Sequence, residues 1–147
     1  MKKKRQFMLF VAGLALALIS SGQASAQLTA TLAIDNTATI TRDRIEVIVT
    51  GRYSCSPIPS EDLGGFAGIN GNVIEASARQ TAFGSFFLDV TTTCDGVEHT
   101  FTVNVPTNFI PWHGGLARIM GSIFASDCSV IPCLFASASV DETIRLH

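Results

Sequence analysis

Alternation of apolar and polar residues with a period of two is the feature that most constrains this chain. It recurs from residue 28 to residue 146 in short runs that are rich in β-branched and aromatic residues. Successive side chains of a β-strand point to opposite faces, so this period indicates strands that bury one face. No long run follows the 3.6-residue period of an amphipathic helix. The sequence therefore predicts an all-β fold.

Seven short strands within one domain predict a two-sheet antiparallel sandwich of the immunoglobulin type. The second strand places five residues on the face expected to point to the core: Ile45, Val47, Val49, Tyr53 and Cys55. The seven strands cover about residues 28–34, 45–55, 72–79, 86–94, 99–105, 115–125 and 133–146.

The connections between these strands carry recognisable turn signals. Asp95-Gly96 predicts a two-residue hairpin turn in which both residues take positive φ. Pro106 is expected to end the fifth strand, and we expect a bulge at Asp141-Glu142 in the last one. If the strands alternate in direction, the links 56–71, 95–96 and 127–132 gather at one end of the sandwich.

Four cysteines, at positions 55, 94, 128 and 133, form an even set that suits disulfide bonds in an oxidising compartment. Four cysteines permit three pairings. The short spacing of Cys128 and Cys133 favours a local bridge, which leaves Cys55 to pair with Cys94. No Cys-x-x-Cys spacing suggests a metal site.

Residues 1–26 have the three parts of a secretory signal peptide. Residues 2–5 are basic, residues 7–19 are apolar, and Ala24-Ser25-Ala26 precedes Gln27 as a cleavage site. The apolar run is shorter than the roughly 18 to 20 residues that span a bilayer. We therefore expect residues 27–147 to be a single domain that is secreted or periplasmic, with no membrane span.

The expected exported part is acidic. It holds twelve Asp and Glu residues against six Arg residues, a formal charge of −6, and every lysine lies within the first 26 residues. Such a surface lacks the cations that displace counterions from a phosphate backbone. The charge pattern therefore argues against binding of nucleic acid.

Three motifs lie on the predicted strands: Gly-x-Tyr-x-Cys at 51–55, Cys-Asp-Gly with an aromatic strand at 94–103, and Gly-x-Ala at 115–117. Together they resemble small secreted bacterial immunoglobulin-like sandwich domains of unknown function. The segment 125–137 is similar to the last hairpin of neocarzinostatin-type apoproteins, which are immunoglobulin-like carriers of a small apolar chromophore. In that family the first disulfide closes a much shorter loop than a Cys55–Cys94 bridge does. The resemblance implies the sandwich fold.

His99 and His113, with Asp95 and Glu98 near the first, are the candidate acid–base residues. No nucleophile motif such as Gly-x-Ser-x-Gly accompanies them. We expect His99 to pack as a half-buried strand residue and His113 to cap a turn, and we expect no catalytic residue, metal or cofactor. The oxygen-bearing residues that could contact calcium lack the spacing of an EF-hand: Asp35, Asn36, Glu61 and Asp62.

Two long loops are the candidate binding segments. Loop 56–71 is rich in Gly and Pro and equally suits a flexible cover over a sheet edge. Loop 108–115 holds the single tryptophan, Trp112, which we expect to plug the open end of the sandwich rather than to contact a ligand. The residues that could bind a ligand are Leu63, Phe66, Ile69, Trp112 and Phe135.

These observations favour a non-enzymatic exported module that binds or presents a surface, with the end built from residues 56–71 and 127–132. The alternative is a neocarzinostatin-type carrier of a small apolar ligand, with a cleft lined by loop 56–71 and Phe135. A secreted hydrolase is the third hypothesis. A carrier needs a concave apolar pocket and an enzyme needs converging polar groups, whereas a surface module needs neither. The expected partner is a protein, a glycan or a small apolar ligand.

Overall fold

A computed structural model describes residues 27–77 and 79–147, so the predicted signal peptide lies outside the described residues. The described chain is all-β, as predicted. No helix within these two ranges is long and apolar enough to cross a membrane. The elements are β1 (Ala30–Ile34), β2 (Thr37–Ile40), β3 (Glu46–Cys55), the short 3-10 helix η1 (Glu61–Leu63), β4 (Gly65–Ala76), β5 (Thr81–Asp89), the 3-10 helix η2 (Thr91–Thr93), β6 (His99–Pro106), β7 (Gly115–Asp127) and β8 (Leu134–Leu146).

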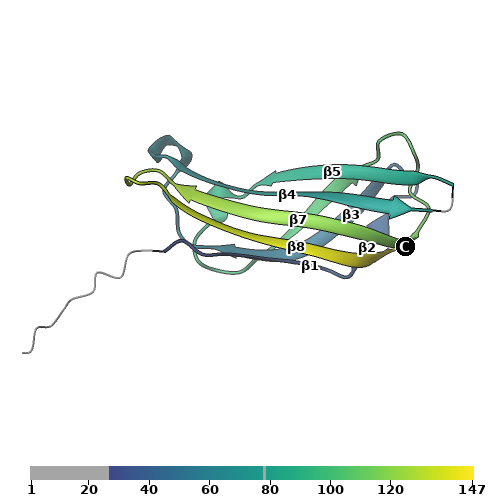
Figure 1. Ribbon diagram of the computed structural model, residues 1–147, viewed down its shortest axis with the longest axis horizontal. Helices are drawn as coiled ribbons and strands as arrows, with labels where there is room; N and C mark the ends of the chain where they lie inside the picture. Colours follow the sequence, from purple (N-terminus) through teal and green to yellow (C-terminus); the bar gives the residue numbers. More distant parts are fainter. Residues whose placement is uncertain (1–26, 78) are drawn as a thin grey trace, which may run out of the picture.

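The strands form the two layers of an immunoglobulin-like sandwich (Figure 1). One layer contains β1, β3 and β6, and the other contains β5, β4, β7 and β8 in that order. Strand β2 joins the layers because it pairs antiparallel with β3 and parallel with β8. All the other pairs are antiparallel, so the predicted fold class is confirmed. The short strand β2 was not predicted.

The core lies between the layers, where alternate residues of the long strands meet. Val47, Val49, Tyr53 and Cys55 of β3 are all buried, which confirms the core face predicted for this strand. Ile45 is the exception: it precedes β3 and remains 51% exposed, so its assignment to the core was wrong. The facing layer contributes alternate residues of β4 and β7, of which the largest fully buried ones are Ile69, Val73, Ile119 and Ile123.

Strand β4 begins at Gly65, seven residues before the predicted start. Residues 65–74 pair continuously with β7, so pairing across the sheet extends the strand through a glycine-rich sequence. The glycines accommodate neighbouring rings, since a Cβ atom on Gly71 would lie 2.5 Å from the ring of Phe86. The long loop predicted over residues 56–71 is therefore shortened to residues 56–64.

The hairpin predicted at Asp95-Gly96 is wrong, because β5 and β6 belong to different layers. The chain crosses from one layer to the other between Asp89 and His99, and of the two turn residues only Gly96 has positive φ. The predicted bulge in the last strand is also wrong. The β7–β8 register runs without interruption from Gly115↔Leu146 to Asp127↔Leu134.

Both predicted disulfides are confirmed, with Cα–Cα distances of 4.9 Å for Cys55–Cys94 and 4.3 Å for Cys128–Cys133. They link the end of β3 to the connection 90–98 and close the connection 128–133; these two connections and the connection 56–64 form what we call the disulfide end. Two backbone hydrogen bonds tie these connections together: Gly96 N–H donates to Cys55 O, and Cys128 N–H donates to Gly64 O.

The opposite end of the sandwich, formed by residues 41–45 and 107–114, is called the Trp112 end. Trp112 is fully buried there, and its backbone N–H donates to the carbonyl oxygen of Arg44 over 3.0 Å. The backbone N–H of His113 donates to the buried carboxylate of Glu75 over 2.8 Å. These contacts fold the loop inward and close this end.

Candidate functional site

The outer face of the β5-β4-β7-β8 layer carries the most conspicuous group of accessible apolar side chains. The even-numbered residues of β4 and β7 and the odd-numbered residues of β5 and β8 lie on this face. The residues that alternate with them in each strand point to the core. Four phenylalanines come from four adjacent strands and lie toward the disulfide end. We call them the phenylalanine row: Phe87 of β5, Phe66 of β4, Phe124 of β7 and Phe135 of β8.

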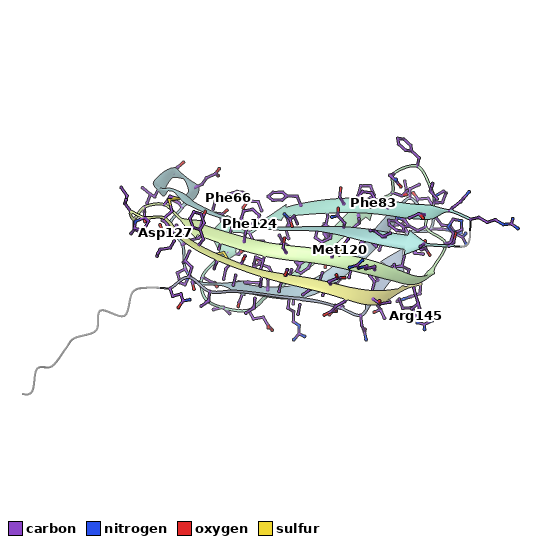
Figure 2. The ribbon with its side chains drawn as sticks, viewed as in Figure 1. Phe66, Phe83, Met120, Phe124, Asp127 and Arg145 are labelled. Carbon is purple, nitrogen blue, oxygen red and sulfur yellow. A yellow bond between two sulfur atoms is a disulfide. The ribbon has the colours of Figure 1, made fainter. Side chains whose placement is uncertain are left out.

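Strand register brings these rings together. Ser126 lies opposite both Phe66 and Phe135, and Phe124 lies opposite Gly68. The ring centroids of Phe66 and Phe124 are 5.5 Å apart at an interplanar angle of 46°, a tilted arrangement that aromatic pairs favour. Figure 2 shows these two side chains side by side near Asp127, whereas Phe83 lies toward the other end.

Gly68 forms the floor between two members of the row. A Cβ atom at this position would come within 2.8 Å of the Phe87 ring and 3.2 Å of the Phe124 ring. The absent side chain therefore leaves room for both rings to lie over the backbone. Phe87 and Phe135 remain 56% and 72% exposed, so a partner could still bury much of their surface.

A hollow of about 410 Å³ adjoins the row between β7 and β8. It is lined by two rings of the row, Phe124 and Phe135, with the small residues Ala125, Ser126, Ala136 and Ser137. Small side chains between two large ones leave a depression on an otherwise flat sheet. Its surface can accept an apolar group and offers a few hydroxyl groups to orient it.

Apart from Asp89, which lies opposite Gly68 on the same face, the surroundings of the row are mostly neutral. Ser122 donates a hydrogen bond to the side-chain oxygen of Asn70 in the middle of the same face. Farther along, the guanidinium of Arg118 donates two hydrogen bonds to the carboxylate of Asp141, which lower the pKa of Asp141 and raise the pKa of Arg118. Because this pair neutralises its own charge, it adds little net field near the row.

A second hollow, of about 320 Å³, lies at the disulfide end beside Cys94. Glu61 and Asp89 give it acidic groups. The backbone N–H and the hydroxyl of Thr91 lower the pKa of Asp89 by hydrogen bonding. Within the described residues, no group of three or more His, Cys, Asp or Glu side chains could hold a metal ion.

The five residues expected to bind a ligand separate into two groups. Ile69 and Trp112 are fully buried in the core, so neither side chain is available to a ligand; this corrects the expected set. Leu63, Phe66 and Phe135 have accessible side chains, with Leu63 64% exposed on η1. The row therefore contains two of the expected residues, Phe66 and Phe135.

Phe87 and Phe124 were missed, although a signal for both was present. Each alternates with residues that pack inward: Phe87 lies between Phe86 and Leu88, and Phe124 lies between Ile123 and Ala125. Strict alternation therefore directs both to solvent. The sequence does not show that they lie beside Phe66, because that depends on how β5 and β7 pair with β4.

The two candidate acid–base histidines lie apart, His99 near the disulfide end and His113 at the Trp112 end. His99 is half-buried on β6, and its Nε2 lies 2.9 Å from Asp95 Oδ1. This hydrogen bond, together with one from Val97 N–H, lowers the pKa of Asp95. The side chain of His113 is exposed. The structure does not bring the two histidines together.

Comparisons with known proteins identify no family. No family model and no curated protein matches the chain. The chain is similar to AggA, the major subunit of aggregative adherence fimbriae type I from Escherichia coli, at 11% identity over 82% of this chain and 94% of that chain, with a TM-score of 0.41. It is also similar to Spo0M, a sporulation control protein from Bacillus subtilis, at 11% identity over 82% of this chain and 49% of that chain, with a TM-score of 0.33. Both similarities are too low to indicate a function.

Proposed function

We propose that this chain is an exported, non-enzymatic binding module and that the phenylalanine row is its contact surface. The observation that carries the proposal is the convergence of four aromatic rings from four adjacent strands, over a glycine that leaves room for them. Contiguous apolar patches on a soluble domain often mark interaction sites. Aromatic side chains also contribute strongly to binding energy when a partner buries them.

The scaffold supports this role. The row stands on hydrogen-bonded strands, and two disulfides constrain the connections at the same end. A rigid surface loses little conformational entropy when it binds, so more of the contact energy appears as affinity. Disulfides also suit an oxidising compartment, and we propose a secreted or periplasmic location.

A small apolar ligand is the second candidate partner. The hollow between β7 and β8 favours it, because its volume of about 410 Å³ lies within the range of small-molecule sites. Phe135 lines this hollow, as expected for a carrier, but loop 56–64 does not. A carrier would therefore hold its ligand against the sheet rather than beneath the loop.

Native mass spectrometry of protein recovered from the producing cells tests the proposal. We expect the wild-type chain to retain a bound mass that the double variant Phe124→Ser/Phe135→Ser lacks. One constant small mass indicates a carrier, and a co-purified chain or polymer indicates a surface module. The control is Leu116→Ser, which removes an exposed side chain from the far end of the same face. Equal retention by the double variant would contradict the proposal.

A further inference from the structure

Strand β5 is the free edge of its layer, and its sequence does little to protect that edge. It is the last strand in the order β8-β7-β4-β5. Its residues 81–88 include no charged side chain and no proline, and β5 pairs with β4 without a bulge. Natural proteins usually protect such edges with charges, prolines or bulges, since the unpaired backbone groups can pair with another strand.

The free part of this edge can be located from one pair of hydrogen bonds. Both backbone groups of Phe83 bond to Asn108, which lies outside the layer: Asn108 N–H donates to Phe83 O, and Phe83 N–H donates to Asn108 Oδ1. Odd-numbered residues of β5 therefore direct their backbone groups away from β4. Asn108 covers this edge at Phe83, while within the described chain Ser85 and Phe87 have no partner on that side.

We propose that a second copy of this chain pairs antiparallel with residues 85–89 of β5, with Phe87 opposite Phe87 of the other copy. This inference does not depend on the proposed function of the row. The covered position of Phe83 excludes pairing centred on Ser85, which would need the backbone of Phe83. A register centred on Phe86 would also avoid Phe83, but it sets Ser85 opposite Phe87. Centring on Phe87 instead places Ser85 opposite Asp89 in both halves, and this complementary pair is the reason for the proposed register.

The chemistry of the strand favours a second copy as the occupant. A two-fold axis at Phe87 pairs the hydroxyl of Ser85 with the acceptor carboxylate of Asp89 twice, and brings two phenyl rings together.

Pairing would also join the two exposed faces. The row of one copy would continue into the row of the other across the shared edge, because Phe87 is both the row's outermost member and the centre of the pairing. The result is a single sheet of eight strands, with four from each copy. Such a dimer presents two equivalent hollows to one extended partner.

Sedimentation velocity of the chain 27–147 gives the first test. We expect a concentration-dependent dimer in the wild type, and a rise of about 100-fold or more in its dissociation constant for Phe87→Lys, which sets two like charges opposite each other. The matched control is Thr102→Lys on β6, the edge strand of the other layer, which should dimerise as the wild type does. A wild-type monomer at all concentrations, or a dimer lost only in the control, would overturn the proposal.

Cysteine cross-linking gives a second test that does not need the strand to carry a charge. Opposite residues in a hydrogen-bonded antiparallel pair have Cα atoms about 5.5 Å apart, a separation that a disulfide spans. Phe87→Cys should give a covalent dimer on mild oxidation. Phe83→Cys lies on the same face of the same strand but outside the pairing, and should not. Cross-linking of Phe83→Cys alone, or of neither variant, contradicts the proposed register.

Discussion

The two ends of this sandwich are stabilised in different ways. The Trp112 end has no disulfide and is closed by a fully buried tryptophan, with backbone hydrogen bonds to Arg44 O and Glu75. The disulfide end is tied by Cys55–Cys94 and Cys128–Cys133, and two rings of the adjoining phenylalanine row, Phe87 and Phe135, are exposed. Covalent bridges can constrain loops without burying large side chains. The comparison indicates that the two ends are held in order by different means, one by a buried side chain and the other by covalent bonds.

Replacing Trp112 by Ser should have the largest effect on stability. The indole is fully buried, and its Nε1 has no hydrogen-bond partner among the described residues, so packing supplies its contribution. Loss of a large buried aromatic side chain costs about 3 to 5 kcal/mol of the free energy of unfolding. Urea unfolding, monitored by circular dichroism, measures this loss in the free energy of unfolding. A loss below about 1 kcal/mol would show that the tryptophan does not close this end.

Removing the disulfides one pair at a time should show which bridge stabilises the other end. In the chain-entropy model, the Cys55–Cys94 bridge contributes about 4 kcal/mol and the short Cys128–Cys133 bridge about 2 kcal/mol. The double variants Cys55→Ala/Cys94→Ala and Cys128→Ala/Cys133→Ala should differ in that order in urea unfolding. The reverse order would mean that the local bridge, rather than the long one, holds this end together.

Adjacent phenylalanines of β5 offer a matched test of the two faces. Phe86 is 8% exposed and packs beside Gly71, whereas Phe87 is 56% exposed on the outer face. Phe86→Ser should lower the free energy of unfolding by about 3 to 5 kcal/mol, and Phe87→Ser by about 1 kcal/mol or less. Chemical denaturation of both variants decides this. Equal losses would place Phe87 in the core and remove it from the row.

Phe109 is an exposed aromatic residue at the Trp112 end and should behave unlike the row. It is fully exposed and takes a φ of 95°, a region that L-residues rarely adopt. Phe109→Gly should relieve this backbone strain and raise the free energy of unfolding by about 1 kcal/mol. A shift of the thermal midpoint measures it. A loss of stability would show that the phenyl ring makes a contact that supports the loop.

The smallest expected effect concerns the electrostatic interaction of Asp95 with His99, next to the Cys55–Cys94 disulfide. The hydrogen bond from His99, followed by one from Val97 N–H, holds the pKa of Asp95 below its ordinary value. A carboxyl group whose pKa is lowered by folding stabilises the fold at any pH above its ordinary pKa. This stabilisation is lost as the pH falls through the lowered pKa of the folded state. In an NMR titration, His99→Ala should raise the pKa of Asp95. An unchanged value would assign the shift to Val97.

Much of this architecture could be predicted from the sequence, because alternation fixes which residues of a strand face the core. It placed Val47, Val49, Tyr53 and Cys55 correctly, and with the cysteine spacing it gave both disulfides. Local sequence patterns gave wrong predictions for segments whose structure depends on strands that are distant in the sequence. Residues 65–71 extend β4 only because β7 pairs with them, and Asp95-Gly96 resembles a hairpin turn but leads into the other layer.

The candidate site was predicted in part, for a related reason. Phe66 was identified from loop 56–71 and Phe135 from the resemblance to a neocarzinostatin-type hairpin, whereas Ile69 was assigned to a loop that is in fact a buried strand. The row exists because register aligns residues from four strands, and register depends on contacts that single-strand patterns do not contain.

Photo-cross-linking in producing cells tests most directly whether the disulfide end is the binding end. p-Benzoylphenylalanine replaces Phe135 of the row in one variant and Phe109 of the Trp112 end in another. Both side chains are exposed, and Phe109 is the more exposed of the two. If exposure alone decided cross-linking, the control position 109 would therefore give more adduct than position 135. We expect an adduct of defined mass from position 135 and none from position 109. An adduct only from position 109, or from neither position, would contradict the assignment of the row as the contact surface.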